Sequence, residues 1–127
     1  MNIFKNKNIK IILSKNASEE IFRLKDIIGK EIIKGTHSSE HQTLLRSIER
    51  VFELLKQNPF AGDQIPKRLI PKIYIEIYNI NNLWRVELSN FWRMTYTVRT
   101  NELEIINFVL EIVDHKRYDK IFGYEKK

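Results

Sequence analysis

Residues 84–94, WRVELSNFWRM, contain the dipeptide Trp-Arg twice and decide how the rest of the chain is arranged. Successive side chains of a β-strand point to opposite faces, so in each half of this stretch the tryptophan and the arginine lie on opposite faces. A hairpin loop with an odd number of residues keeps both tryptophans on the same side of the hairpin. Residues 89–91, Ser-Asn-Phe, form such a loop. The stretch therefore predicts a β-hairpin whose inner face carries the tryptophans and whose outer face carries Arg85 and Arg93.

The length of this loop also determines which residues face each other across the hairpin. The predicted pairs are Trp84–Tyr96, Val86–Met94, Leu88–Trp92, Arg85–Thr95 and Glu87–Arg93. The first three pairs are apolar, so the large aromatic rings are predicted to pack in the core rather than to stack bases on the surface. Glu87 is predicted to neutralise Arg93 partly, which leaves Arg85 the freer of the two arginines.

Two helices are predicted between residues 14 and 59, because apolar residues recur there at helical spacing. The first begins at Ser14 or Asn16, either of which can accept a hydrogen bond as its N-cap, and ends near residue 34. The second begins at Ser38 or Ser39 and ends at an Asn-Pro pair. Two successive helices with a short link predict a helical hairpin.

The remaining segments predict β-strands and, with the helices, the class of fold. The predicted strands are residues 9–14, 83–88, 91–98 and 103–113. The alternating stretch KIYIEIYNI, residues 72–80, predicts a further strand or an extended edge segment. The order β-α-α-β-β-β predicts a small α+β sandwich, an antiparallel sheet with two helices packed on one face. Because no linker or repeat interrupts the sequence, residues 1–127 are predicted to form a single domain.

The last predicted strand continues the alternation of inner and outer side chains. Phe108, Leu110 and Ile112 are predicted to point to the core, because they share a strand face with one another. Asn107 and Glu111 then point to the outer face. This face is predicted to be exposed to solvent, and it gains a carboxylate close to the two arginines of the hairpin.

The outer face therefore brings together the side chains that a metal-free ribonuclease needs. They are Arg85, Glu87, Arg93, Glu111, His115 and Lys116. A base takes the proton from a ribose 2′-OH, arginines neutralise the phosphorane-like transition state, and an acid protonates the leaving oxygen. RNA carries its own nucleophile, so neither a metal nor another cofactor is expected. The simpler alternative is a charged sheet face on which Glu87 and Arg93 form a stabilising cross-strand pair.

The charge of the chain favours a polyanionic partner. The formal net charge is +6 and the isoelectric point is about 9.5, which raises the expectation of binding to nucleic acid. A loop rich in proline carries Lys67 and Arg68, with Lys72 just beyond it, and Arg99 follows on the predicted outer face. These four side chains are candidate RNA contacts, although a solvated basic loop explains the first three equally well.

Composition excludes several other classes of protein. The chain has no cysteine, which excludes a disulfide framework and a thiolate zinc site. No apolar stretch is long enough to cross a bilayer, and the N-terminal apolar run is too short for a signal peptide, so a cytoplasmic protein is predicted. Residues 37–41, HSSEH, match a zinc-protease pattern. An N-cap at Ser38 or Ser39 would leave His37 outside the helix, so this pattern predicts an ordinary helix start and no metal site.

Four stretches of the sequence together carry a family resemblance. They are NLWRVELSNFWRMTYTV (82–98), DHKRYDKIFGY (114–124), IKIILSKNASEEI (9–21) and the loop NPFAG…IPK (58–67). These stretches resemble the RelE/ParE superfamily of type II toxin–antitoxin toxins, most closely a branch with NLW, WR-x-x-Y-T and DHK-x-Y signatures. The resemblance covers most of the chain. It implies a β-α-α-β-β-β toxin that a cognate antitoxin neutralises, with RelE-type members cleaving mRNA in the ribosomal A site and ParE-type members inhibiting DNA gyrase.

The resemblance also implies roles for individual residues. RelE-type toxins use basic residues on the second strand, an arginine that opens the third strand, and a basic residue and a tyrosine near the C-terminus. Arg85 falls on a lysine position of the second strand, and Arg93 falls on the arginine that contacts the phosphate. His115 and Lys116 match the basic pair that follows the last strand.

Three positions depart from the pattern of RelE-type toxins or leave alternatives. Tyr118 is the nearest match to the C-terminal tyrosine, with Phe122 and Tyr124 as alternatives because the spacing differs. Glu87 stands where a second lysine is often found. Lys116 replaces the usual arginine and lacks the two-pronged hydrogen-bonding geometry of a guanidinium.

Three functions therefore stay open from the sequence. The first is a ribosome-dependent mRNA endonuclease in which Arg85 and Arg93 hold the scissile phosphate. In it Glu87 or Glu111 is the base, and His115 is the acid, helped by Lys116 and Tyr118. The second is a ParE-like inhibitor of DNA gyrase. The third is a non-catalytic member of the fold that binds an antitoxin or a nucleic acid.

Overall fold

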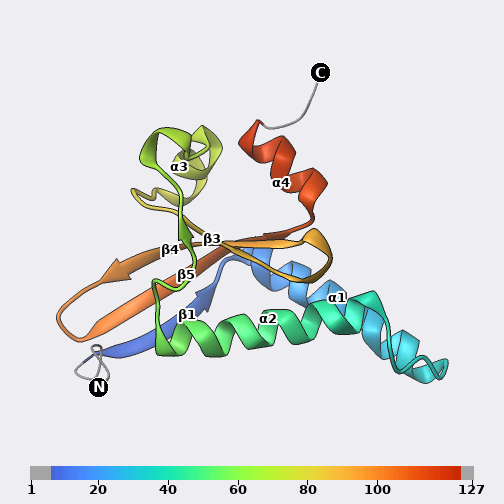
Figure 1. Ribbon diagram of the computed structural model, residues 1–127. Coiled ribbons are helices and arrows are strands. Elements are labelled where there is room, and N and C mark those ends of the chain that lie inside the picture. The colour runs from blue at the N-terminus through green and yellow to red at the C-terminus, as the bar shows by residue number, and fades with distance from the viewer. Residues whose placement is uncertain (1–6, 124–127) are drawn as a thin grey trace.

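The computed structural model describes residues 7–123, which form an α+β fold (Figure 1). The helices in this part of the chain are α1 (Lys15–Ile33), α2 (Glu40–Gln57), α3 (Lys72–Tyr78) and α4 (His115–Phe122). The strands are β1 (Asn8–Leu13), β2 (Asp63–Gln64), β3 (Trp84–Glu87), β4 (Arg93–Thr100) and β5 (Glu104–Val113). A single 3₁₀ turn lies at Lys67–Leu69, and a tight turn with positive φ at Asn90 and Phe91 spans Ser89–Phe91.

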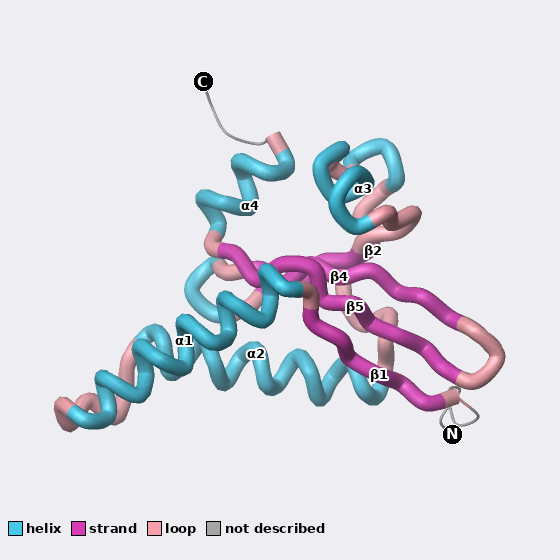
Figure 2. The backbone as a smooth tube through the Cα atoms, turned by 180° about the vertical axis from the view of Figure 1, so that it is seen from behind, coloured by secondary structure: helices cyan, strands magenta, loops and turns pink. Residues whose placement is uncertain are grey.

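The strands form one mixed sheet in the order β1-β5-β4-β3-β2. Strand β1 runs parallel to β5, and the other neighbours are antiparallel, so the prediction of a wholly antiparallel sheet is wrong at this edge. Helices α1 and α2 cover one face of the sheet, here called the inner face. Helices α3 and α4 stand over the opposite, outer face (Figures 1 and 2). The sheet is therefore covered on both faces, not on one.

The hairpin predicted from residues 84–94 is confirmed. Its loop consists of Ser89–Phe91, and four of the predicted pairs are present. They are Trp84–Tyr96, Arg85–Thr95, Val86–Met94 and Glu87–Arg93. Tyr96 is fully buried, and both tryptophans are half-buried against the core beneath α1 and α2. Parity and loop length were therefore sufficient to assign these side chains to the two faces.

Residues 72–78 form helix α3, so the strand predicted there is wrong. The sequence KIYIEIY alternates isoleucine with polar and aromatic residues, but Tyr74 and Tyr78 are also four residues apart, the spacing that a helix places on one face. Pro71 precedes the helix, and Asn79 ends it in the left-handed conformation with φ of 53°. Tyr74 is buried against the sheet, while the isoleucines between the tyrosines are exposed. Packing of the two tyrosines thus outweighs the β-propensity of the isoleucines.

A β-bulge in β5 changes which of its side chains face the core. The register along β4 shifts between Thr95 and Tyr96. As a result Val109, rather than Leu110, faces the inner core, and Leu110 joins Phe108 in a second apolar cluster on the outer face. Ile112 and Glu111 lie on the faces predicted for them. The faces predicted for Asn107, Phe108 and Leu110 are wrong, because the one extra residue of the bulge reverses the alternation of side chains on its N-terminal side.

Two hydrogen bonds accommodate the altered strand. Asn107, predicted on the outer face, lies on the inner face, where its Nδ2 donates to the carbonyl of Pro59 at 3.0 Å. Ser14 donates through Oγ to the carbonyl of Leu110 at 2.5 Å and accepts a hydrogen bond from the backbone N–H of Ala17 at 3.0 Å. Ser14 is therefore the N-cap of α1 and also ties the start of this helix to the bulge.

The outer face has its own apolar core, which the sequence did not predict. Its buried members are Ile65, Ile70, Tyr74, Ile80, Leu83 and Leu110. Phe108 and two residues of α4, Ile121 and Phe122, pack against them. The face that carries Arg85 and Arg93 is consequently not an open, solvated surface. Helices α3 and α4 partly cover this face.

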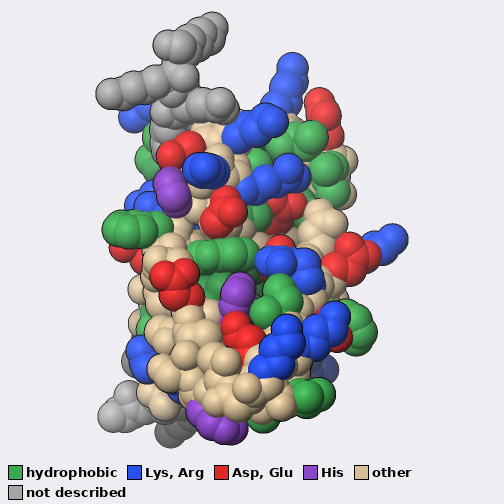
Figure 3. Space-filling view, turned by 90° about the vertical axis from the view of Figure 1, so that its right-hand side faces the viewer, with side chains coloured by type: hydrophobic (Ala, Val, Ile, Leu, Met, Phe, Trp, Pro, Cys, Tyr) green, Lys and Arg blue, Asp and Glu red, His purple; other side chains and the backbone are tan. Residues whose placement is uncertain are grey.

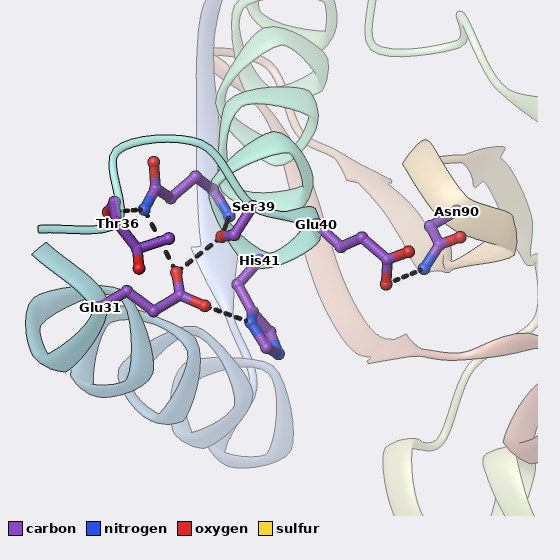
Figure 4. Close-up of polar contacts among 7 residues, drawn as sticks. Glu31, Thr36, Ser39, Glu40, His41 and Asn90 are labelled. Carbon is purple, nitrogen blue, oxygen red and sulfur yellow. Dashed lines mark hydrogen bonds and ion pairs between the residues drawn. The ribbon is translucent and has the colours of Figure 1, made fainter. Parts of the chain in front are cut away.

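A polar network joins the end of α1 to the start of α2 (Figure 4). Ser39 is the N-cap of α2: its Oγ accepts a hydrogen bond from the N–H of Gln42 at 3.2 Å and donates to Oε1 of Glu31 at 2.6 Å. Nδ1 of His41 lies 2.9 Å from Oε2 of the same carboxylate. The hydrogen bonds from Ser39 and then from His41 hold the pKa of Glu31 below its ordinary value. Glu31 thus serves as a shared acceptor that fixes the turn between the helices.

Ser39→Ala is expected to lower the free energy of unfolding by about 1–2 kcal/mol, because it removes the cap of α2 and one donor to Glu31. Ser38→Ala is the matched control, since Ser38 is exposed and precedes the cap, and it should change stability by less than about 0.5 kcal/mol. Urea unfolding of both variants measures the difference. Equal losses would show that Ser39 does not cap the helix.

Stability at high pH should depend on Tyr96. Burial raises the pKa of Tyr96 from 10.0 to about 12. Its hydroxyl therefore keeps its proton in the folded state after the unfolded chain has lost it. The stabilisation is fully present below pH 10 and is lost as pH rises towards 12, by up to about 1.4 kcal/mol per pH unit. Urea unfolding between pH 9 and 12 should show a steeper loss in the wild type than in Tyr96→Phe, and identical slopes would contradict this.

No helix within residues 7–123 is long and apolar enough to cross a membrane.

Candidate functional site

The sheet places the two arginines in neighbouring rows of its outer face. One row crosses three strands as Arg85, Thr95 and Glu111, which are paired in register. The adjacent row contains Glu87 and Arg93, paired across β3 and β4. Side chains opposite each other on one face of an antiparallel pair lie within reach of one another, so this arrangement gathers both guanidinium groups at the hairpin end of the sheet.

Tyr118 of α4 lies between the two arginines. Asp114 caps α4 by accepting a hydrogen bond from the N–H of Arg117 at 2.8 Å, and one turn later the ring of Tyr118 is buried against the sheet. Cζ of Arg93 is 5.1 Å and Cζ of Arg85 is 5.7 Å from the centre of this ring, which is cation–π distance for both. Nη1 of Arg85 also donates to the hydroxyl of Tyr118 at 3.0 Å.

This arrangement distinguishes Tyr118 from Phe122, two of the three aromatic residues considered for the C-terminal position. Tyr118 contacts both arginines, whereas Phe122 stacks behind Tyr118 with ring centres 4.2 Å apart and meets Tyr74 edge-on. Tyr124 lies outside the described residues. Of the two aromatic residues that the structure describes in α4, Tyr118 contacts the arginines and Phe122 packs against Tyr118.

Both arginines keep an unused hydrogen-bond donor. Among the described residues, the Nε atoms of Arg85 and Arg93 are buried and have no hydrogen-bond partner. Their acidic neighbours are distant for direct hydrogen bonds: Asp63 lies 3.9 Å from Arg85, and Glu87 lies 3.9 Å from Arg93. A buried donor without a partner is unfavourable and rare in a folded protein. The partly exposed guanidinium groups on adjacent rows, with no carboxylate of residues 7–123 in hydrogen-bond contact, form a place suited to an anion such as a phosphate.

The two arginines differ, but not as predicted. The side chain of Arg93 is 17% exposed and donates through Nη1 to the carbonyl of Phe91 at 2.6 Å. The side chain of Arg85 is 31% exposed and is held by Tyr118. Burial opposes the charge of Arg85, but the hydrogen bond with Tyr118 and the nearby carboxylates raise its pKa overall. Arg85 is thus fixed and charged, not freer than Arg93.

The structure also separates the two candidate bases. The side chain of Glu87 is 69% exposed and stands beside Arg93 at the rim of the site. Glu111 is buried, and its Oε2 accepts hydrogen bonds from the hydroxyl of Tyr78 at 3.0 Å and from Nδ2 of Asn16 at 3.2 Å. Burial and the Glu111 carboxylate raise the pKa of Tyr78, so its hydroxyl stays protonated as the donor. Glu87 is the accessible carboxylate, and Glu111 is a buried anchor for α1 and α3.

Tyr74 completes the row of polar groups between the arginines and Glu111. Its buried hydroxyl lies 3.1 Å from Oγ1 of Thr95 and 3.5 Å from Oε1 of Glu111. Burial, reinforced by the Glu111 carboxylate, raises the pKa of Tyr74 well above its ordinary value. Neither tyrosine of α3 was predicted to contribute here. Their spacing of four residues places both side chains on one face of either a strand or a helix, so the spacing alone did not distinguish the two.

The two basic residues after β5 lie at the first turn of α4. His115 and Lys116 are both exposed there. The ring of His115 lies edge-on to that of Phe91, with centres 6.0 Å apart. His115 therefore lies near the residue whose carbonyl Arg93 binds, at the open rim of the site, where a proton donor can meet a substrate.

The other basic candidates are not gathered at the arginines. Lys67 and Arg68 are exposed on the 3₁₀ turn before α3, and Lys72 is exposed at the start of that helix. Arg99 donates to the carbonyls of Tyr78 and Asn79 at 3.2 and 3.4 Å, so it holds the end of α3. Figure 3, which views the molecule from the side that carries α4, shows basic and acidic side chains interspersed rather than one continuous basic patch. Any contribution of these residues to RNA binding is peripheral to the arginine site.

The HSSEH stretch does not assemble a metal site. Helix α2 begins at Glu40 after the Ser39 cap, so His37 precedes the helix. His41 forms a hydrogen bond with Glu31 (Figure 4). Within residues 7–123, no group of three or more histidine and acidic side chains could hold a metal ion.

No protein-family model, curated protein or solved structure matches the chain.

Proposed function

We propose that this protein is a RelE-like toxin, an RNA endonuclease that cleaves mRNA on the ribosome and is neutralised by a cognate antitoxin. The observation that carries the proposal is the pair of arginines that contact Tyr118, whose side chains are 31% and 17% exposed and whose nearest carboxylates among the described residues lie 3.9 Å away. Guanidinium groups bind phosphate oxygens through parallel hydrogen bonds. Their rigid support by Tyr118 suits a charge that develops during the reaction.

The proposed reaction uses groups at the rim of the site for proton transfer. The carboxylate of Glu87 takes the proton of a ribose 2′-OH, and the 2′-oxygen forms a bond to phosphorus. Arg85 and Arg93 neutralise the additional negative charge of the pentacoordinate phosphorane. The bond from phosphorus to the 5′-oxygen breaks, and the imidazolium of His115 gives its proton to the leaving oxygen. The products are a 2′,3′-cyclic phosphate and a 5′-hydroxyl end.

Lys116 has a supporting role in this proposal. It is exposed next to His115 and adds positive charge where the RNA backbone approaches. Lys67, Arg68 and Lys72 are proposed to meet ribosomal or messenger RNA farther away, since they are exposed on the same outer side of the sheet. Such contacts make binding depend strongly on salt, because each neutralised phosphate releases counterions.

A translation assay with mapped mRNA ends tests the proposal. The folded wild-type protein should cut mRNA on translating ribosomes and leave 2′,3′-cyclic phosphates. A message with a 2′-deoxynucleotide at the cut site should stay intact, because it lacks the nucleophile. If folded wild-type protein cuts nothing, the nuclease proposal is wrong. Inhibition of DNA gyrase in a supercoiling assay would then identify the ParE-like alternative, and a lack of both activities would favour a non-catalytic binding protein.

A further inference from the structure

Phe91 occupies a backbone conformation that its side chain disfavours. The N–H of Trp92 donates to the carbonyl of Ser89 at 3.1 Å and closes a four-residue turn. The two central residues, Asn90 and Phe91, have φ values of 55° and 63°. Turns with two positive φ values favour Asn-Gly, and a bulky residue at the second position is strained. Folding of this hairpin alone would therefore favour glycine over phenylalanine at position 91.

The ring of Phe91 packs little against the core, so burial does not offset the strain of its backbone. It is 70% exposed, whereas its partner aromatic residues in the hairpin, Trp84, Trp92 and Tyr96, are buried or half-buried. A strained conformation that contributes so little to packing is more often found at functional sites than elsewhere. The strain fixes the direction in which an exposed aromatic ring points.

The turn that carries Phe91 is held firmly in place. Nδ2 of Asn90 donates to Oε2 of Glu40 at 3.1 Å, which attaches the turn to the start of α2 (Figure 4). The N–H of Ser89 donates to Oγ of Ser47 at 3.3 Å, farther along the same helix. Two independent hydrogen bonds to α2 therefore keep the hairpin tip from swinging away from the site.

Phe91 is also connected directly to the arginine site. Nη1 of Arg93 donates to its carbonyl at 2.6 Å, and the ring of His115 lies edge-on to its ring at 6.0 Å. An exposed aromatic face thus stands beside the arginine and the histidine that the proposed reaction uses. Aromatic faces next to cationic side chains bind unstacked bases of single-stranded RNA, since every base has a π-face.

We propose that Phe91 is a stacking platform for a nucleobase of single-stranded RNA next to the phosphate that Arg93 binds. This inference rests on the proposed function and adds a base-binding subsite to it. The strained turn directs the ring, the bonds to α2 keep the turn rigid, and Arg93 couples the position of the ring to that of the phosphate. A base held by Phe91 would bring its own ribose and phosphate into register with the arginines.

Binding of a short single-stranded RNA, 2′-O-methylated so that it cannot be cut, tests the inference. Phe91→Ala should weaken binding by about 10-fold to 100-fold, because it removes one base-stacking contact. Phe91→Trp should retain the wild-type affinity. Phe22→Ala is the matched control: Phe22 is an aromatic residue of α1 that is 75% exposed, and its removal should leave RNA affinity unchanged. An RNA with an abasic site at the stacked position should bind wild type and Phe91→Ala equally weakly.

Phe91→Gly separates stacking from a structural role of the ring. Glycine relieves the strained turn, so this variant should melt at the same temperature as the wild type or higher, yet bind RNA as weakly as Phe91→Ala. Equal RNA affinity of the wild type and Phe91→Ala would overturn the stacking subsite and leave the nuclease proposal standing. If the wild type binds the RNA but cuts no mRNA, while Phe91→Ala binds weakly, the subsite survives and the nuclease does not. Failure of the wild type to bind this RNA would overturn the stacking subsite, whereas the nuclease proposal stands or falls with cleavage in the translation assay.

Discussion

Arg93→Ala is expected to slow mRNA cleavage on the ribosome about 100-fold to 1,000-fold, the usual effect of removing one donor to a developing negative charge. Arg93 is the more buried of the two arginines, and water cannot easily replace a guanidinium at a position that is 17% exposed. Arg93→Lys keeps the charge but loses the paired donors, so it should recover only part of the rate. Single-turnover cleavage on programmed ribosomes, with excess protein, measures the chemical step separately from binding.

The control for this experiment must remove an equal charge elsewhere. Arg46 of α2 serves this purpose, because it is exposed on the opposite side of the sheet and bonds to Thr43 of its own helix. Arg46→Ala should cut at the wild-type rate. Comparable losses in Arg46→Ala and Arg93→Ala would show that net charge alone matters. Wild-type cleavage by a folded Arg93→Ala protein would refute the role of Arg93 in neutralising the phosphate.

The register of the hairpin could be predicted because strand periodicity and loop length are both local. A loop of three residues allows only one matching of the apolar faces, so the pairing of Arg85 with Thr95 and of Glu87 with Arg93 followed from the sequence. The bulge in β5 depends instead on a distant partner, since Ser14 from the start of α1 binds the carbonyl of Leu110. The alternation of residues 104–113 does not contain that information, so the faces predicted for Asn107, Phe108 and Leu110 are reversed.

Helix α3 is a second segment that its local sequence mispredicts, because its residues have high β-propensity. Every second residue of 72–78 is isoleucine, and the segment also holds two tyrosines, both residue types that favour strands. Four residues span about 13 Å in a strand but only about 6 Å in a helix, so the helix brings both tyrosines close enough for their hydroxyls to reach Glu111. These hydrogen bonds can form only after the sheet has assembled. Tertiary contacts therefore override the local preference.

The residues that make up the candidate site could be predicted from the sequence, but their burial beneath α3 and α4 could not. Alternation placed the arginines on one face, yet it could not show that α4 would lay Tyr118 between them or that α3 would bury Glu111. These two facts change the chemistry, because they leave Glu87 as the accessible carboxylate and make Arg85 a fixed group. The covering of a sheet face depends on where a C-terminal helix docks, which the periodicity of single elements does not specify.

Gly62→Ala is expected to destabilise the protein by about 2–4 kcal/mol, because Gly62 packs closely against the strand that carries Arg85. A Cβ atom at this position would lie 2.7 Å from the backbone carbonyl oxygen of Arg85 and 2.9 Å from both the hydroxyl of Tyr96 and Cγ2 of Val86. The carbonyl belongs to the central part of β3, so it cannot move without shifting the strand that carries Arg85. The N–H of Gly62 also donates to the hydroxyl of Tyr96 at 3.0 Å, and displacement of the loop would break this bond.

Gly29→Ala is the matched control, because a Cβ there meets nothing within 4 Å and Gly29 lies inside α1. It should stabilise the protein by about 0.5–1 kcal/mol, the difference between alanine and glycine in a helix interior. Urea unfolding of the two variants should therefore show shifts of opposite sign. If Gly62→Ala folds as stably as the wild type, the close approach of this loop to β3 is wrong. If it folds but cuts mRNA slowly, the shift of Arg85 accounts for the loss, since no side chain of the site has been removed.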